Sequence, residues 1–281
     1  MIIDLHSHST VSDGTLTPSE LLAHARRQEV DVLALTDHDS VDGLAEAAIA
    51  AEQHGVELIN GVEISTSWKG QTIHMVGLGV DPANQALGDG LASLCEYRSW
   101  RAEEIGRRLA KKRIEGAYEG AKAFANGSLI ARTHYARFLI DAGYCKDMRE
   151  VFKKYLVRGR PGYVPGDWAS IEDATGWIRG AGGIPVIAHP ARYRITAGRL
   201  RKLLGEFKEC GGLAMEVISG SHNEEESKTM AAHAVRAELL ASQGSDYHGP
   251  ENPWIELGRL RPMPEGCEAV WQSEYWQKAE S

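Results

Sequence analysis

The chain has 281 residues, of which 43% are hydrophobic and 25% charged, and its net charge is −8. This composition is typical of a folded globular protein, and no stretch approaches the roughly 20 apolar residues that cross a bilayer, so we expect no membrane partner. The acidic balance also argues against long duplex nucleic acid as a partner, because such binding depends on many contacts between basic side chains and phosphates.

The first third of the sequence alternates between predicted strands and helices. Thr17 has the position of a helix N-cap, with Pro18 at the first helical position and Glu20 at the third. Residues 32–36 are almost continuously apolar, which is typical of a buried parallel strand. The other elements predicted here are strands at residues 2–5, 56–64 and 72–80 and a helix at residues 44–54.

The pattern changes in the middle of the chain. Residues 98–160 carry a net charge of +9, while the rest of the chain carries −17. We therefore predict a basic, mostly helical insertion at residues 98–163, between two parts of one barrel domain at residues 1–97 and 164–281. Beyond the insertion we predict helices at 171–181, 199–210 and 224–237 and strands at 184–188, 215–218 and 239–245.

Repeated strand–helix units indicate an α/β fold with a parallel sheet, either open or closed as a barrel. The first residues lack the basic region and long apolar run of a signal peptide. The cysteines are scattered and form no Cys-x-x-Cys pair, so we expect reduced thiols in a cytoplasmic protein. They are Cys95, Cys145, Cys210 and Cys267.

Six of the eleven histidines lie at or just past the ends of predicted strands, or within one strand that flanks them. In parallel α/β folds the loops at the carboxyl ends of the strands converge, so we expect these side chains to meet. Residues i and i+2 on a strand face the same side, which pairs His6 with His8 and Asp246 with His248. The six are His6, His8, His38, His74, His189 and His248.

Carboxylates accompany these histidines. Asp13 and Glu63 could bridge two ions, and a mixture of imidazole and carboxylate ligands suits Mn²⁺, Fe²⁺ or Zn²⁺. A single histidine at a strand end is more often structural, but six with three carboxylates in the same register favour a metal centre. We expect two or three divalent ions per chain, with Mn²⁺ preferred.

The ordered series of motifs resembles the PHP (polymerase and histidinol phosphatase) family over nearly the whole chain. The motifs are Asp-Leu-His-Ser-His-Ser from residue 4, Leu-Thr-Asp-His-Asp from 35, Gly-Val-Glu-Ile-Ser from 61, Ala-His-Pro from 188 and Gly-Ser-Asp-Tyr-His from 244. The resemblance implies a distorted seven-stranded βα barrel with three metal sites. It assigns His6, His8, Glu63 and Asp246 to the first site, Glu63, His74 and His189 to the second, and Asp13, His38 and His248 to the third.

Within the family, the chain resembles the branch with a helical insertion, whose members act on nucleoside 3′,5′-bisphosphates or on short phosphorylated RNA. The markers include Ala-Arg-Thr-His from residue 131 and Gly-Tyr-Val-Pro from 162, in or beside the basic segment. Arg132 and His134 are the first candidates to bind an anionic part of the substrate. Arg192 and Lys154 are further candidates, with a surface salt bridge as the alternative for each.

The expected reaction is hydrolysis of the 3′ phosphate of a small nucleoside 3′,5′-bisphosphate. In it, metal ions lower the pKa of the attacking water and neutralise charge on the phosphoryl group. The residues expected at the reacting centre are Asp37, His38, Glu63 and Asp246, with Asp37 or a water as the group that protonates the leaving oxygen. Alternatives are 5′-to-3′ removal of nucleotides from short 5′-phosphorylated RNA, and hydrolysis of another small monoester such as histidinol phosphate.

Two other classes of protein also fit part of the pattern. A C–N hydrolase of the amidohydrolase type begins with His-x-His on a barrel strand, but it usually has a bridging lysine where this chain offers Glu63. A non-catalytic metal-binding or scaffold domain would tolerate the loss of ligands, whereas every expected ligand is present here. Both classes are therefore disfavoured.

Overall fold

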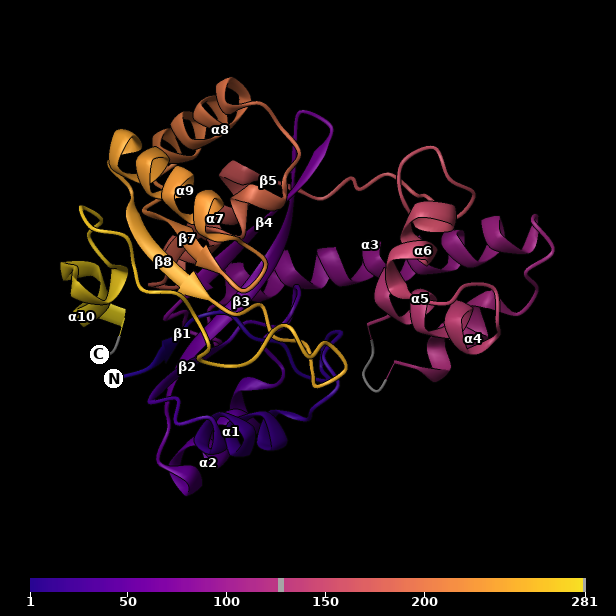
Figure 1. The fold of residues 1–281 in the computed structure, drawn as a ribbon, viewed down its shortest axis with the longest axis horizontal. Coiled ribbons are helices and arrows are strands. Elements are labelled where there is room, and N and C mark those ends of the chain that lie inside the picture. The colour runs from indigo at the N-terminus through magenta and orange to yellow at the C-terminus, as the bar shows by residue number, and fades with distance from the viewer. Residues whose placement is uncertain (126–128, 280–281) are drawn as a thin grey trace.

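The computed structural model describes residues 1–125 and 129–279 of the chain. Within them, seven strands form one sheet in the order β1-β2-β3-β4-β6-β7-β8, and the short β5 pairs with the outer part of β3. Helices cover the outside of the sheet (Figure 1). The strands are β1 Ile3–Asp4, β2 Val32–Leu35, β3 Glu57–Trp68, β4 Gln71–Leu78, β5 Ala169–Ser170, β6 Ile184–Ile187, β7 Ala214–Ser219 and β8 Leu240–Gly244.

The two ends of the sheet, β1 and β8, approach each other and nearly close it into a barrel. The backbone N–H of Leu5 donates to the carbonyl of Gln243 (3.1 Å), and just beyond the strands the N–H of Asp246 donates to the carbonyl of His6 (2.9 Å). The distorted seven-stranded barrel with a mostly helical insertion is therefore confirmed. Closure brings the first and last strands of the chain side by side.

The sheet is mixed, which corrects the parallel sheet expected from the repeated strand–helix units. β4 runs antiparallel to both of its neighbours, β3 and β6. Only Lys69 and Gly70 join β3 to β4, and their φ angles of 48° and 76° are those of a tight hairpin turn. A two-residue connection cannot cross over the sheet, so this strand pair has to be antiparallel.

The helices around the barrel lie close to their predicted positions, except that α10 was not predicted. Thr17 and Glu20 form the expected capping box at the start of α1, and Thr196 and Asn223 cap α8 and α9. Each cap satisfies backbone N–H groups that the first turn leaves free. The helices are α1 Pro18–Arg27, α2 Leu44–His54, α7 Ile171–Gly180, α8 Ala197–Glu209, α9 Glu224–Ala237 and α10 Glu274–Ala279.

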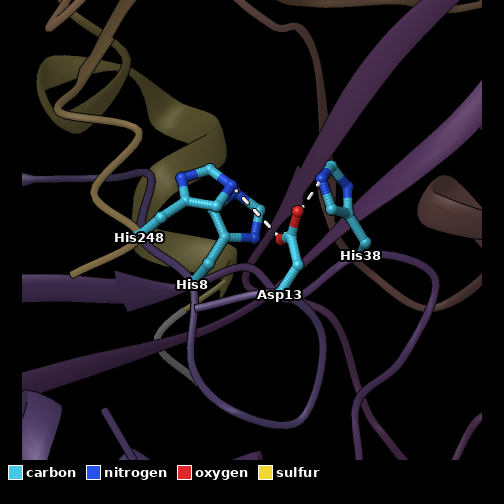
Figure 2. Close-up of side chains that lie close together, drawn as sticks. All are labelled: His8, Asp13, His38 and His248. Atoms are coloured by element: carbon cyan, nitrogen blue, oxygen red, sulfur yellow. Dashed lines mark ion pairs between the residues drawn. The ribbon is translucent and has the colours of Figure 1, made fainter. Parts of the chain in front are cut away.

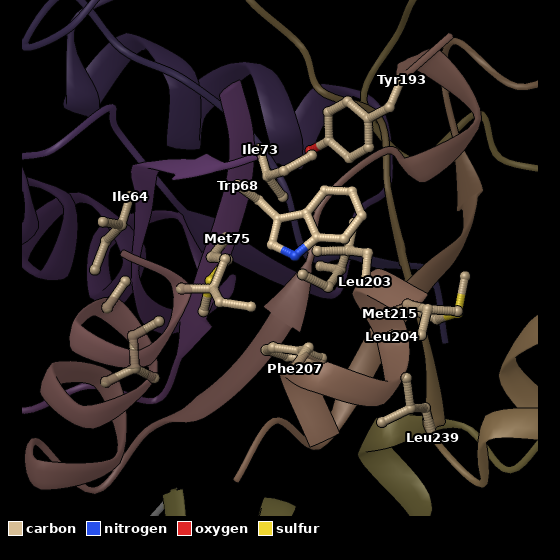
Figure 3. Packing of buried hydrophobic residues seen from close by; sticks show 14 of the residues in the cluster. Ile64, Trp68, Ile73, Met75, Tyr193, Leu203, Leu204, Phe207, Met215 and Leu239 are labelled. Carbon is tan, nitrogen blue, oxygen red and sulfur yellow. The ribbon is translucent and has the colours of Figure 1, made fainter. Parts of the chain in front are cut away.

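A large hydrophobic core lies between the sheet and the helices α7, α8 and α9 (Figure 3). Trp68 from β3, Met75 from β4 and Met215 from β7 belong to it, together with Leu203 and Phe207 from α8. All five are at most 4% exposed. This packing holds in place the strands that carry the polar residues of the site.

The helical insertion is attached through α3, Gln85–Ala110, which runs from the barrel into a separate group of helices (Figure 1). Residue 98, the predicted start of the insertion, lies within this helix, which begins much earlier because the Asn84 side chain caps it. Residues between 102 and 164 build a hydrophobic cluster of their own, around Leu109, Tyr135 and Leu139. The other helices are α4 Ala117–Ala123, α5 Arg132–Asp141 and α6 Met148–Val151, followed by a π-helical turn at Phe152–Leu156.

Two further expectations can be compared with the structure. The four cysteines are free, as predicted. In the part of the chain that the structure describes, none of the helices combines the length and apolar character needed to cross a membrane.

Barrel closure can be tested at Gly244, the last residue of β8. A Cβ atom at this position would lie 2.2 Å from His6 Cβ and 2.8 Å from His6 N, just beyond the strand β1 that closes the barrel. We expect Gly244→Ala to lower the free energy of unfolding by about 1–3 kcal/mol or more, as overpacking does. Denaturant unfolding measures the change.

The matched control is Gly205→Ala in α8, where a Cβ meets no described atom within 4 Å. It should leave stability unchanged or raise it by up to about 1 kcal/mol, since alanine favours a helix interior. Equal stability of the two variants would contradict the close contact between β1 and β8.

Candidate metal centre

The nine side chains predicted to bind metal lie together at one end of the barrel. Glu63 and His74 lie within β3 and β4, and the others lie just beyond the strands or in the loops that follow them. Three overlapping groups of nitrogen and oxygen atoms have the spacing of metal ligands. The nine residues are His6, His8, Asp13, His38, Glu63, His74, His189, Asp246 and His248.

The first group joins the end of β1 to the end of β8. The Nε2 atoms of His6 and His8 are 3.1 Å apart, on one side of the chain as expected for residues i and i+2. They lie 3.4 and 3.3 Å from Glu63 Oε2, and 3.5 and 3.3 Å from Asp246 Oδ1. Two nitrogen and two oxygen atoms thus surround a common point.

The second group surrounds the same glutamate. Glu63 Oε1 lies 2.9 Å from His74 Nδ1 and 3.0 Å from His189 Nε2. Glu63 Oε2 lies 2.8 Å from His38 Nδ1. The ligand atoms of His38, Glu63 and His74 all lie within 4.8 Å of one another, so His38 joins a group in which the sequence analysis did not place it.

The third group is centred on Asp13 (Figure 2). Asp13 Oδ1 lies 3.2 Å from His248 Nε2 and 3.7 Å from His38 Nε2. His8 belongs to this group as well, and its ring stacks on that of His248 with 4.2 Å between centroids. His38 therefore uses one ring nitrogen in each of two groups.

Several of the nitrogen and oxygen atoms that could bind metal are buried and have no hydrogen-bond partner in residues 1–125 and 129–279. They include Glu63 Oε2, Asp13 Oδ1 and His38 Nδ1. Although Glu63 Oε2 and His38 Nδ1 are close, their orientation is not that of a hydrogen bond. A buried polar atom without a partner costs about 1–3 kcal/mol. Lone pairs that converge in this way fit divalent cations, which would satisfy them.

The electrostatics of the centre point in the same direction. Burial alone would raise the pKa of Glu63, but the surrounding histidines, His38 foremost, hold this pKa well below its usual range. The pKa values of Asp13 and Asp246 are also held well below the usual range, against the effect of burial. In turn, Asp246 and Glu63 raise the pKa of His8 to about 10, although burial opposes this. The carboxylates therefore favour positive charge beside them, which divalent ions would supply in place of protons, whereas burial lowers the pKa of His38 to about 4 and also lowers that of His189.

Two residues of the centre have a strained backbone. His189 has a φ of 29° and Asp246 a φ of 58°, in a region that residues other than glycine rarely adopt. Such strain is found most often at functional sites, where the surrounding structure holds it in place.

Glu216 in β7 supports two of the proposed ligands, His6 and His189, and the sequence analysis missed it. Its Oε1 lies 2.6 Å from His6 Nδ1, and its Oε2 accepts the backbone N–H of His189 (2.5 Å). This contact fixes the orientation of the His6 ring and leaves Nε2 to face the centre, as partners of metal-binding histidines do. The available signal was a glutamate in the middle of an apolar strand.

Asp37, which was predicted to take part in proton transfer, lies in a network of hydrogen bonds beside the centre. Its carboxylate accepts hydrogen bonds from the backbone N–H of Ser9 (2.8 Å), the Ser9 hydroxyl (2.6 Å) and the Ser12 hydroxyl (2.5 Å). These three donors hold the loop that leads to Asp13. Asp37 therefore anchors that loop, and its role in protonating the leaving oxygen stays a prediction.

Helix α5 of the insertion contacts the centre directly, which the sequence did not reveal. The Thr133 hydroxyl donates to Asp13 Oδ2 (2.9 Å), and the Arg137 guanidinium donates to the Asp13 carbonyl (3.2 Å). The insertion thus helps to position one of the carboxylates that could hold metal.

The predicted substrate-binding residues differ in their surroundings. Arg192 lies at the centre, where its Nη1 donates to Asp246 Oδ2 (2.5 Å). Arg132 lies over the ring of Phe152 (5.5 Å to the centroid) and makes no hydrogen bond or ion pair within the described residues. The other two have partners within the insertion: His134 Nδ1 accepts the N–H of Ala131 at the start of α5, and Lys154 pairs with Glu150 (2.7 Å) on the surface. Their binding of substrate stays a prediction.

Comparisons with known proteins agree with this architecture. The model of the PHP domain matches residues 4–158. The 3′,5′-nucleoside bisphosphate phosphatase of Chromobacterium violaceum is 48% identical over 96% of this chain and 95% of its own length. The 5′-3′ exoribonuclease Rnm of Escherichia coli is 45% identical over 100% of this chain and 96% of its own length.

A solved structure from Chromobacterium violaceum resembles the fold throughout. It is described as an amidohydrolase with bound sulfate and no metal. Its TM-score to this structure is 0.95, with 47% sequence identity, and the match covers 99% of this chain and 97% of the other.

Glu63 offers the sharpest test of the metal centre, because its carboxylate belongs to two of the three groups. We expect Glu63→Gln to lower the affinity for Mn²⁺ by at least about tenfold, since the amide has no charge and a poorer donor set. Metal content after dialysis, measured by mass spectrometry, and a binding titration give the loss.

Glu224→Gln is the matched control, since Glu224 lies on the surface of α9 and pairs with Lys228. It should keep the metal content of the wild-type protein. An unchanged metal content in Glu63→Gln would mean that Glu63 holds no ion.

His134 predicts a pH dependence in the insertion. Burial lowers its pKa to about 4, compared with about 6.5 in an unfolded chain. The neutral ring caps α5, so its contribution is complete above pH about 6.5 and is lost as the pH falls toward 4. The loss amounts to about 3 kcal/mol. Hydrogen exchange of the α5 amides over this pH range should therefore show falling protection.

His134→Gln provides the control, because glutamine at the same position can still accept the capping hydrogen bond but does not titrate. Its α5 should lose less protection between pH 6.5 and 4 than the wild-type helix does. The same loss in both proteins would assign the effect to another group.

Proposed function

The chain belongs to the PHP domain family, and we propose that it hydrolyses the 3′ phosphate of nucleoside 3′,5′-bisphosphates, for example pAp to AMP and phosphate. The family and the named relatives make it a metal-dependent phosphoesterase. The observation that carries the finer proposal is a cluster of histidines and carboxylates with two guanidinium groups close by. Arg192 contacts Asp246, and Arg132 interacts electrostatically with Arg192 and Asp13.

The proposed ligand side chains would hold divalent ions next to the scissile phosphate. Divalent ions held by them would polarise the phosphoryl group and lower the pKa of the attacking water. We propose Mn²⁺ as the preferred ion, with Fe²⁺ or Zn²⁺ as substitutes, because the donors are imidazole nitrogens and carboxylate oxygens. The proposed ligands are the nine residues of the centre, with Glu63 shared between two ions.

Two arginine side chains would bind the phosphate groups of the substrate in addition to the ions. The Arg192 side chain is 51% exposed and lies beside Asp246, so its guanidinium can bind an oxygen of the phosphoryl group. Arg132 has no carboxylate partner in the described part of the chain and would bind the second phosphate. The bound sulfate in the Chromobacterium violaceum structure supports a site for tetrahedral anions in this fold.

We also propose that residues 98–163 form a domain that covers the substrate. The net charge of +9 in residues 98–160 suits a polyanionic substrate, and the contacts of Thr133 and Arg137 with Asp13 join this segment to the metal centre. A monoester with one phosphate, such as histidinol phosphate, would need less positive charge than this segment provides.

A second candidate activity is 5′-to-3′ removal of nucleotides from short 5′-phosphorylated RNA. The relative from Escherichia coli carries that name and matches the whole of this chain. Both reactions need a phosphate anchor and a neighbouring phosphoester, so the same residues could serve either.

The test is to incubate the Mn²⁺-loaded protein with adenosine 3′,5′-bisphosphate and to separate the products by chromatography. We expect phosphate together with AMP that keeps its 5′ phosphate. Asp246→Asn, which alters the centre, should lose the activity by a factor of about 100 or more. This variant also excludes a contaminating phosphatase.

The same protein should be given a 5′-phosphorylated oligoribonucleotide. Shortening of the RNA without turnover of the bisphosphate would replace the phosphatase proposal with the exoribonuclease. Failure with both substrates would overturn the substrate assignment but not the metal centre.

A further inference from the structure

A hollow lies on the outside of the barrel between α8 and α9, two helices that run side by side (Figure 1). Its volume is about 230 Å³, and none of the nine proposed metal ligands lines it. One water molecule occupies roughly 30 Å³, so the hollow can hold a small molecule. Its walls are Arg201, Leu204, Gly205 and Lys208 of α8 and His233, Arg236 and Ala237 of α9.

Small residues on both helices leave this space open. A Cβ atom added at Gly205 would meet no described atom within 4 Å, so the α8 side is empty at that point. On the α9 side, Ala237 contributes only a methyl group. Leu204, which is 1% exposed, belongs to the hydrophobic core that holds the two helices in place. The hollow therefore results from small residues on two firmly packed helices.

Three basic side chains surround the hollow, although the chain outside the basic segment carries a net charge of −17. Lys208 has partners: its Nζ donates to the last carbonyl of α9 (2.9 Å) and pairs with Glu238 (2.5 Å). Arg201 and Arg236 form no ion pair and no hydrogen bond with any residue that the structure describes. Two guanidinium groups without partners at one hollow provide the donors that an oxyanion needs.

His233 adds a polar side chain that also lacks a partner. The residue is only 8% exposed, and in the described part of the chain it makes no hydrogen bond or ion pair. Burial and the charges of Arg201 and Arg236 lower its pKa, so its ring is neutral at pH 7 and can donate one hydrogen bond. A buried polar group without a partner is unfavourable, and an anion in the hollow would accept its hydrogen bond.

We propose that this hollow is a binding site, separate from the metal centre, for a phosphate dianion that is either free or carried by a small molecule. Arg201 and Arg236 would donate to the phosphoryl oxygens through their guanidinium groups, and His233 would donate a further hydrogen bond. Lys208 would add electrostatic attraction. Three cations and the carboxylate of Glu238 leave a charge of +2, which matches the dianion. The site does not depend on the proposed reaction.

The test follows the ring of His233 by NMR in Zn²⁺-loaded protein, because the filled d shell of Zn²⁺ leaves the signals sharp. The His233→Gln variant identifies the resonance. Inorganic phosphate is added at pH 7.5 and at constant ionic strength, with chloride as the reference anion. We expect a change in the chemical shift of His233 that saturates at millimolar phosphate. Phosphate bound at the metal centre does not contribute to this signal.

The double variant Arg201→Gln/Arg236→Gln removes both charges that have no partner. Both side chains are exposed, so the variant should fold as the wild type does. We expect its affinity for phosphate to fall about 10- to 100-fold or more, the size expected for the loss of hydrogen bonds between charged groups. Gly205→Leu keeps every charge but fills the hollow, and it should abolish the saturable change.

Arg199→Gln is the matched control on α8. Arg199 is exposed like the two other arginines, but it lies over the ring of Trp68 (5.5 Å to the centroid) and does not line the hollow. This variant should keep the affinity of the wild type. It separates a local site from a general effect of positive charge on the surface.

A second titration replaces phosphate with adenosine 5′-monophosphate. Binding at least as tight as that of phosphate, with the same dependence on Arg201 and Arg236, would assign the site to a phosphorylated small molecule. Weaker or absent binding would assign it to the free ion. The proposal would be overturned if neither anion gave a saturable change, or if the double variant or Gly205→Leu bound phosphate as tightly as the wild type.

Discussion

The structure depends on one constraint, the burial of an ionised carboxylate at the end of a closed sheet. Glu63 is 0% exposed, and its two oxygens face histidines that come from three other strand ends and from β4. An isolated carboxylate in such a place would be strongly unfavourable, so positive charge has to surround it. The barrel provides this by closing, because only closure brings the residues after β1 next to those after β8. The fold therefore determines how the proposed metal ligands meet.

A second layer of acidic residues holds the ligand loops in position. Asp4 accepts the backbone N–H groups of Ser245 (2.8 Å) and Gly258 (2.9 Å), which ties the segments after β8 to β1. Asp37 does the same for the loop before Asp13, and Glu216 binds both His6 and the backbone of His189. These contacts go mostly to backbone donors, so they fix where the loops run and leave the ligand atoms free. These hydrogen bonds preorganise the centre for ions, which lowers the free-energy cost of assembling it.

The sequence was informative wherever the signal was local. Strand ends, the i and i+2 histidine pairs and the capping box at Thr17 are set by neighbouring residues, and the structure has them close to where they were predicted. Contacts between distant segments left no such signal: nothing near Thr133 in the sequence indicates that it meets Asp13. The early start of α3 was missed because its first turns contain Gly88 and Gly90, which are poor helix formers. Gly90 is needed there, since a Cβ atom would lie 2.5 Å from the Trp177 ring.

The charge asymmetry of the chain fits the roles proposed for the barrel and for the insertion. The barrel segments carry the acidic excess, part of which lies in the centre, where two or three divalent ions would offset it. Under the proposed function, the insertion would provide positive charge that remains after the ions are bound, and guanidinium groups suit this purpose because they stay protonated. Arg98 pairs with Asp39 and so joins α3 to the barrel, whereas Arg101 and Arg132 form no ion pair within residues 1–125 and 129–279. Under the proposed function, the barrel would provide the chemistry of hydrolysis, and the insertion would select the phosphorylated substrate.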